Sequence, residues 1–355
     1  MYKWKSPKPR CYIGVDICSS SVKLVEVCVS NEQPYIQAYG VASLPHDAME
    51  GSSIKDIDAV AHTIRRVLTE CHFTAKKATI ALPDSLTISR TIHVHKTLRL
   101  EEIQLLVSIE VEKYISAPID DVYYDFDIIG GSIDNPDMLE VLIVASRIDQ
   151  VVTREQALIR AELEAYAVDI NSFAVERAAT CLKRKDAKVN NKYITAIINL
   201  GIEHTTYHLL LGTKHMFSHE VAFGGKHLMK SVWEKHKMGE VGDTHKILTT
   251  IPPHDFIQPL KEMLIPHIQN GLQFFNLYTR YSHINKIFLT GDLGSTFNLA
   301  KDIQEQLSIQ TRLASPLQQV EKSKRICAKH FQFHEPLLFT ACGLALKHFM
   351  SNSLR

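Results

Sequence analysis

IGVDICSSSVKLVEV, residues 13–27, is the stretch that decides the fold. A continuous apolar run ends at three serines, Ser19 to Ser21, and alternating apolar and polar residues follow them. An uninterrupted apolar run is typical of a buried strand, and alternation is typical of a strand with one exposed face. The stretch therefore predicts a hairpin, with a buried strand over 11–18, a serine-rich turn and a half-exposed strand over 22–29.

The elements that follow this hairpin return in the same order in the second half of the chain. A predicted strand over 35–42 and a predicted helix over 54–71 complete the first copy. The helix is predicted because its apolar residues recur at helical spacing. Asp16 and Asn199 occupy the same place in the two copies, about one domain length apart. That offset indicates two similar domains facing each other rather than a solenoid. The second copy comprises predicted strands over 193–200, 205–211 and 215–222 and a helix over 226–236.

Extra material between the copies predicts an inserted subdomain of βαββα type. Its elements are strands around 79–95, a helix over 100–115, strands over 123–129 and 139–146, and a helix over 151–164. After the second copy we expect a helix over 260–281, a strand over 286–290, and helices over 297–307 and 337–349. The predicted fold is thus α/β, with two similar, duplicated domains and an insert. The expected divisions are a first domain at 1–78, the insert at 79–165, a connection at 166–190 with a polar stretch at 183–192, a second domain at 191–335, and a C-terminal helix at 336–355 that returns to the first domain.

Composition excludes several classes of protein. The 355 residues suit about two domains, and 45% apolar with 22% charged residues is typical of a globular chain. Because 40 Lys and Arg face 39 Asp and Glu, a nucleic-acid-binding surface is not expected. No apolar run reaches the ~18 residues of a membrane helix, so direct membrane insertion is not expected. Seven dispersed cysteines without a C-x-x-C pair favour reduced thiols in a cytoplasmic protein.

The serine-rich turn is a candidate anion site. Successive backbone N–H groups in a turn, together with the hydroxyls of Ser19, Ser20 and Ser21, form a concave site for a phosphate. Lys23 could reach the same anion. A carboxylate at Asp16 would repel a phosphate unless a cation lay between them, which favours Mg²⁺ held by Asp16 directly or through water. The alternative is an ordinary serine-rich hairpin.

Two further turns strengthen the phosphate interpretation. The turn over 199–206 contains Gly201 and two threonines, and Gly224-Gly225 precede a predicted helix whose N-terminus would face an anion. The stretch GDLGS, which starts at Gly291, follows a predicted strand and enters a helix, although an ordinary strand-to-helix connection has the same pattern. The three turns together are more specific than any one of them.

The pattern resembles the actin-like ATPase superfamily, and within it the type IV pilus assembly protein PilM family, which is related to the cell-division protein FtsA. The segments that carry the resemblance span nearly the whole chain: IGVDICSSSVKLVEV, EVEKYISAPIDDVYYDFD, VLIVASR, VDINSFAVERA, INLGIEHTT, GGKHL, IFLTGDLG and TACGLALKHF. The resemblance implies that the duplicated domains are actin-like (ribonuclease H-like), with the βαββα-type subdomain inserted. It also implies a nucleotide site between the halves and places Asp169, in the connecting segment, near it. The residues implied to contact ATP and its Mg²⁺ are Asp16, Cys18, Ser19, Ser20, Ser21, Lys23, Asn199, Gly201, His204, Thr205, Gly224, Gly225, Gly291 and Asp292, with Asp16 toward the metal through water.

Three positions depart from the family pattern, and all three fall at the nucleotide. Cys18 and Asp292 stand where glycines are usual, and Asn199 stands where an aspartate is usual. The added Cβ of Cys18 resists left-handed backbone torsions by ~1 kcal/mol. An amide at Asn199 cannot hold a hydrated metal as a carboxylate does, and the charge of Asp292 disfavours a close nucleotide. We therefore expect ATP and Mg²⁺ binding to be weak or absent, with little or no hydrolysis.

The resemblance also implies a function and partners. The expected function is a cytoplasmic scaffold of the type IV pilus inner-membrane alignment complex, which binds an N-terminal peptide of the membrane protein PilN in a groove beside the insert. Other pilus inner-membrane and motor components are further implied partners, and they would hold the protein peripherally at the inner membrane. The alternatives are an active actin-like ATPase and an FtsA-like filament-forming protein. A zinc site is not expected, since His204 and His208 on one strand would lie ~13 Å apart.

Overall fold

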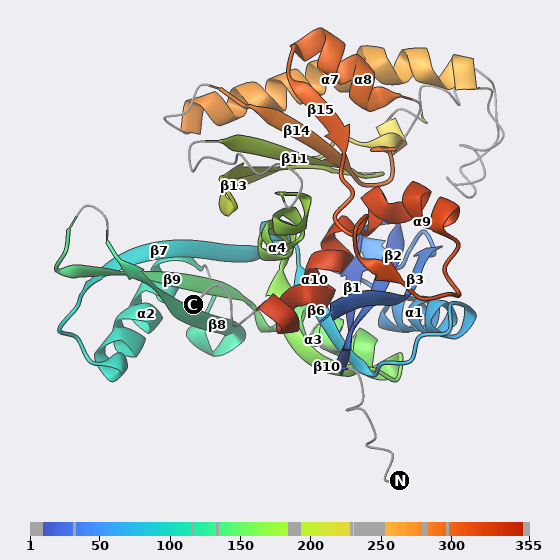
Figure 1. The fold of residues 1–355 in the computed structure, drawn as a ribbon. Helices are drawn as coiled ribbons and strands as arrows, with labels where there is room; N and C mark the ends of the chain where they lie inside the picture. The colour runs from blue at the N-terminus through green and yellow to red at the C-terminus, as the bar shows by residue number, and fades with distance from the viewer. Residues whose placement is uncertain are drawn as a thin grey trace, which may run out of the picture.

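The computed structural model has three lobes, which Figure 1 shows as an upper domain, a lower domain on the right and a smaller lobe on the left. The structure describes residues 10–30, 33–115, 117–132, 135–183, 193–227, 230, 253–278, 283–295 and 298–350. Residues 184–192, which hold the end of the connection expected at 166–190 and most of its polar stretch, lie outside these residues, as does most of the helix expected over 226–236.

The first domain is built on a six-stranded sheet in the order β10-β6-β1-β2-β3-β16. Asp56 caps helix α1 (Ile57–Glu70), whose apolar face packs on this sheet together with α3. The strands are β1 (Arg10–Ile17), β2 (Ser21–Ser30), β3 (Gln33–Ser43), β6 (Lys77–Leu82), β10 (Glu164–Ile170) and β16 (Glu321–Lys322), and a short hairpin of β4 (Met49–Glu50) and β5 (Ser53–Ile54) precedes α1.

The predicted hairpin is present, but its second strand is not half-exposed. Strand β2 is buried from Ser21 to Cys28, because helices cover both faces of the sheet. The two charged residues at its expected exposed positions are themselves buried, with Lys23 at 2% exposure and Glu26 at 0%. Each has a specific partner, as described below.

The insert is a three-stranded antiparallel sheet in the order β7-β9-β8, covered on one face by α2. Within the range predicted for the insert, β6 pairs with β1 in the first sheet and α3 packs on α1, so both contribute to the first domain's core. The elements are β7 (Thr87–His95), α2 (Leu100–Tyr114), β8 (Val122–Gly131), β9 (Met138–Arg147) and α3 (Ile148–Arg160), with single 3-10 turns at Asp84–Leu86 and Ile119–Asp121.

The second domain repeats the hairpin and third strand of the first in a five-stranded sheet, β13-β12-β11-β14-β15. Helices α7 and α8 cover the face of this sheet that is turned away from the first domain (Figure 1). The elements are β11 (Ile194–Leu200), β12 (Thr205–Leu211), β13 (Lys214–Val221), α7 (Pro253–Tyr278), β14 (Lys286–Thr290), α8 (Leu299–Leu307) and β15 (Gln310–Leu313). The sequence patterns had not predicted β10, α4, β15, β16 or α9.

Two helices lie between the sheets, α4 (Asn171–Lys183) and α10 (Phe339–Met350), with α9 (Ala328–His334) and a 3-10 turn at Glu335–Leu338 leading into α10. Apolar residues of α4 pack with the second sheet and with Phe339. Gly14 and Gly343 allow α10 to approach β1 and α4, since a Cβ on Gly343 would lie 1.8 Å from the carbonyl oxygen of Ala174. The helix expected over 337–349 is thus present as α10, and it packs in the core.

The expectation of reduced cysteines is wrong at one pair. Cys11 on β1 and Cys28 on β2 lie directly opposite each other, with Cα atoms 4.1 Å apart, and form a disulfide. The hairpin register places them face to face, which dispersed spacing along the chain does not indicate.

Within the described part of the chain, none of the helices combines the length and the apolarity needed to cross a membrane.

Candidate functional site: the cleft between the two domains

The serine-rich turn forms the floor of the cleft on the first-domain side. It is closed by the backbone N–H of Cys18, which donates to the carbonyl oxygen of Ser21 at 2.9 Å, and it is anchored to the next strand by Leu44 N–H, which donates to Ser20 O at 2.9 Å. Ser19 and Ser20 are half-buried. The Ser21 hydroxyl is buried and has no hydrogen-bond partner among the residues that the structure describes.

Asp16 and Lys23 are neighbours across this hairpin. They are paired residues of β1 and β2, so their side chains lie on the same face of the sheet. Asp16 is 7% exposed, and its Oδ2 accepts a hydrogen bond from the Cys18 thiol at 3.6 Å. The sequence-predicted Asp16, Cys18 and Lys23 are therefore brought together.

Asp292, from the other domain, completes the group. Lys23 Nζ lies 3.2 Å from Asp292 Oδ2, although the two residues are 269 positions apart. This ion pair brings the first hairpin and the turn after β14 into contact across the two domains.

Burial and neighbouring charges shift the pKa values of this group. Burial raises the pKa of Asp16, and the nearby Lys23 only partly offsets this. Burial also raises the pKa of Cys18 well above its ordinary value, with Asp16 adding to the effect, so the thiol stays protonated. For Lys23, burial favours a lower pKa, but Asp292 and Asp16 raise it above the ordinary value, so the amine stays charged.

The turns on the second-domain side are bonded to one another. Gly225 N–H donates to Gly201 O at 3.0 Å, and a Cβ on Gly224 would meet the same carbonyl oxygen at 2.5 Å. Gly291 has φ +85°, and a Cβ there would lie 2.3 Å from Oδ1 of Asn199. Asn199 therefore faces the third turn, and glycine is required at 291.

Two predicted residues of the second turn make hydrogen bonds within it. The Thr205 hydroxyl donates to Phe223 O at 2.7 Å and is buried. His204 O accepts from Gly201 N–H at 3.0 Å, which closes the turn. Both interactions hold the shape of the turn whether or not an anion is present.

The residues at the cleft do not fit a phosphate-bound Mg²⁺. A hydrated cation needs a carboxylate that water can reach, whereas Asp16 is buried. The lysine that would bind a phosphate is instead bound to Asp292. Asn199 offers an amide in place of a second carboxylate.

Asp169 lies at the end of β10 and is 5% exposed. Arg177 forms an ion pair with it, Lys347 Nζ lies 3.3 Å away, and Ile170 N–H donates to it at 2.9 Å. These partners satisfy the carboxylate and tie β10, α4 and α10 together, a structural role at the base of the cleft.

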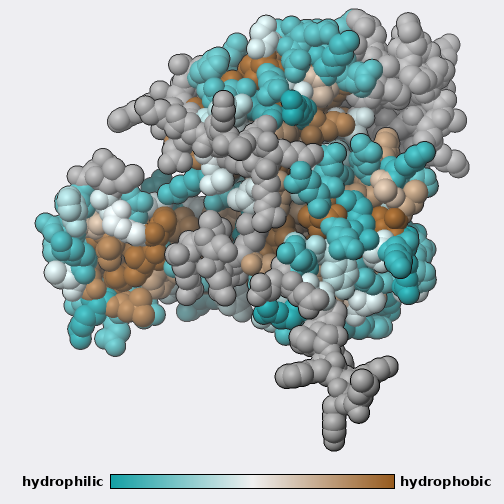
Figure 2. Space-filling view, in the orientation of Figure 1, coloured by the Kyte–Doolittle hydropathy of each residue, from teal (hydrophilic) through white to brown (hydrophobic). Residues whose placement is uncertain are grey.

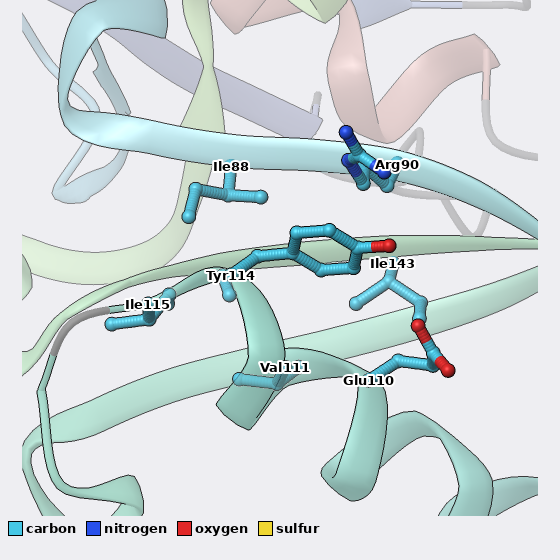
Figure 3. Close-up of a pocket in the computed structure, with 8 residues that line it drawn as sticks. Ile88, Arg90, Glu110, Val111, Tyr114, Ile115 and Ile143 are labelled. Atoms are coloured by element: carbon cyan, nitrogen blue, oxygen red, sulfur yellow. The ribbon is translucent and has the colours of Figure 1, made fainter.

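Sequence reasoning did not identify a pocket at the end of the insert nearest the first domain. It lies between α2 and the sheet and is lined by Ile88, Arg90, Glu110, Val111, Tyr114, Ile115, Ile143 and Ala145. Figure 3 shows the Tyr114 ring across the pocket, below Arg90, whose guanidinium carbon lies 3.9 Å from the ring centroid. The alternation of β7 and β9 was the available signal, because it places Ile88, Arg90 and Ile143 on one face.

A second unanticipated group lies where the insert, α4 and the second sheet meet. The ring centroids of His208 and His215 lie 5.8 Å apart. The backbone N–H of His215 donates a hydrogen bond to the Glu176 carboxylate at 2.9 Å. Burial raises the pKa of Asp84. It lowers the pKa of His208 to about 4, and burial together with His208 lowers that of His215 to about 4.

This lowering predicts a loss of stability in acid. His208 binds a proton in the unfolded chain near its ordinary value of 6.5 but in the folded protein only near 4, so the unfolded state gains protons first as the pH falls. We expect its contribution, on the order of 3 kcal/mol, to be lost between pH 6.5 and 4. Thermal unfolding of the His208→Phe variant should depend less steeply on pH than that of the parent. Equal slopes would contradict this assignment.

Residues 14–349 match the family model described as "Type IV pilus assembly protein PilM". The chain belongs to this family. The structure resembles that titled "PilM-PilN type IV pilus biogenesis complex" at 24% identity and a TM-score of 0.78, over 95% of this chain and 98% of that one. It also resembles the ethanolamine utilization protein EutJ from Carboxydothermus hydrogenoformans at 12% identity and a TM-score of 0.58, over 96% of this chain and 91% of that one. The actin-like fold expected from the sequence is confirmed, and the chain is an actin-like protein of type IV pilus assembly.

Proposed function

We propose that this protein is a cytoplasmic scaffold of the type IV pilus inner-membrane complex, which binds the N-terminal cytoplasmic peptide of PilN. The similar structure is that of a PilM family protein with PilN, and this supports the choice of partner. Binding to PilN would hold the scaffold peripherally at the inner membrane, where other pilus and motor components would also meet it.

The observation that carries the proposal is an open strand edge beside exposed aromatic residues. Among the described strands, β8 pairs only with β9, so its other edge could take an extended peptide. Its side chains are exposed along most of its length, including Tyr123 at 53% and Tyr124 at 40%. An extended peptide could add as a strand and bury these rings.

The strand register links this edge to the pocket of the insert. Ile88, Ala145 and Tyr124 are paired residues across β7, β9 and β8, so they form one row on the face covered by α2. Ile88 and Ala145 line the pocket, and Tyr124 extends the row to the open edge. A peptide on β8 would thus place an apolar side chain next to Tyr124.

Exposed apolar surface gathers on this lobe. Most of the exposed large apolar side chains of the described residues belong to the insert, and Figure 2 shows this surface on the side next to the first domain. On the first domain, Ile159 and Tyr166 are also exposed, at 48% and 41%. A protein seldom leaves a large apolar patch exposed without a partner.

The nucleotide site is proposed to be weakened. The ion pair of Lys23, the buried carboxylate of Asp16 and the amide of Asn199 all favour weak binding of ATP and Mg²⁺ with little or no hydrolysis. No observation at the cleft favours an active ATPase over this interpretation.

The peptide groove makes a testable prediction. Replacing Tyr124 with alanine removes an aromatic ring from the row beside the pocket, and we expect peptide affinity to fall by about tenfold. Fluorescence anisotropy with a labelled synthetic peptide of the PilN N-terminus measures it.

Phe333→Ala is the matched control, since Phe333 is an aromatic residue that is 62% exposed on α9, outside the insert. Its affinity should match that of the parent. If the parent does not bind the peptide, the proposed function is wrong. If Tyr124→Ala binds as tightly as the parent, the peptide lies elsewhere.

A further inference from the structure

One lysine at the centre of the cleft joins the two domains. Lys23 is 2% exposed and comes from the first domain, whereas its partner Asp292 comes from the turn after β14 in the second. A buried ammonium group costs free energy unless it is paired with an anion. Lys23 can therefore be buried between the two domains only because Asp292 pairs with it, unlike an ion pair on the surface.

The backbone around Asp292 holds its carboxylate in place. Gly291 N–H donates to Pro336 O at 3.2 Å, on the segment that leads into α10, and Leu293 N–H donates to Leu200 O at 2.9 Å, at the end of β11. Both neighbours of Asp292 are therefore fixed, one toward each domain. The carboxylate reaches Lys23 from a fixed position.

We infer that Asp292 is the built-in anion of this cleft, which occupies Lys23 in place of a nucleotide phosphate and joins the two domains without a ligand. The inference rests on the proposal that the nucleotide site is weakened, and it names Asp292 as the residue that weakens it. It is independent of the peptide groove. Within the described residues, Asp292 is the group that ion-pairs with Lys23.

A nucleotide has to compete with this arrangement. A phosphate that took Lys23 would displace Asp292 and leave two carboxylates, Asp16 and Asp292, close to its own charge. Displacement would also remove the contact that joins the domains. Removing the negative charge of Asp292 should therefore raise the affinity for nucleotide. It should also weaken the contact between the two domains when no nucleotide is bound.

The test is calorimetric titration of Asp292→Asn with Mg-ADP and Mg-ATP. We expect at least a tenfold gain in affinity over the parent and, without nucleotide, faster hydrogen exchange in β2 and in the turn at 291–294. Asp292→Gly provides a second variant in case the amide disturbs the turn. Lys23→Ala removes the same ion pair but also the cation, so it should loosen the cleft without a gain in affinity.

Asp47→Asn is the matched control, because the Asp47 side chain is 92% exposed and its loss changes net charge equally. It should leave nucleotide affinity unchanged. Asp292 variants that fold and bind no tighter than the parent would overturn the inference, as would tight Mg-ATP binding by the parent with hydrogen exchange unchanged. Peptide binding measured on the same variants tests the scaffold function separately.

Discussion

Gly343→Ala is expected to destabilise the whole protein, although alanine is the better helix former. Gly343 lies within α10, where alanine alone would favour the helix by about 1 kcal/mol. A Cβ at this position would lie 1.8 Å from Ala174 O and 2.5 Å from the carbonyl carbon. Both atoms belong to the backbone of α4 and cannot rotate away. The two helices must separate, so we expect a net loss of about 3 kcal/mol or more.

Thermal unfolding followed by circular dichroism measures this loss, and the fraction of soluble protein is expected to fall with it. Gly131→Ala is the matched control, since a Cβ there would have nothing within 4 Å. It should unfold near the parent's temperature. An unchanged unfolding temperature for Gly343→Ala would show that α10 does not pack on α4 as closely as described.

Glu26→Ala should have the second large effect. Glu26 is fully buried in β2, and its carboxylate accepts three hydrogen bonds from the segment before β6: Thr74 N–H at 2.9 Å, the Thr74 hydroxyl at 2.6 Å and Ala75 N–H at 3.0 Å. Removing the carboxylate breaks three hydrogen bonds to a charged acceptor and leaves a hole in the buried part of β2, although water can reach Thr74, which is exposed. Since a hydrogen bond to a charged group contributes about 1.5–3 kcal/mol, we expect a loss of about 3 kcal/mol.

Unfolding in urea measures this loss. Glu70→Ala removes an exposed carboxylate from α1 and should change stability by about 0.5 kcal/mol or less. Glu26→Gln keeps one acceptor oxygen and should fall between the two. If Glu26→Ala were as stable as Glu70→Ala, the buried carboxylate would not anchor this segment.

The hairpin shows how far local pattern reaches. The run IGVDI, the serines and the alternation after them determine two strands and a turn, and the turn fixes which residues face each other. Once the turn is centred on 19–20, Cys11 must face Cys28 and Asp16 must face Lys23. The disulfide was therefore accessible from the sequence through register, although cysteine spacing alone indicated free thiols.

The burial of β2 was not accessible in this way. Alternation predicts one polar face for a strand, but it cannot show that another part of the chain will cover that face. Here α10 and the turn before it, more than 300 residues further on, cover the face that carries Lys23, and Glu26 is buried on the opposite face beside the segment before β6. The row formed by Ile88, Ala145 and Tyr124 in the insert was not accessible from local pattern either, since it depends on the pairing of three strands.

By itself, the sequence determined the strands and turns of the two hairpins and the repeated order of their elements, because each depends on residues that are close along the chain. Only the tertiary structure decided that Asp292 would lie 3.2 Å from Lys23. That contact requires two separately formed sheets to close on α4 and α10, and the close approach of backbones at Gly14 and Gly343 permits it. The ion pair between Lys23 and Asp292 therefore depends on how the two domains pack together and not on local propensity.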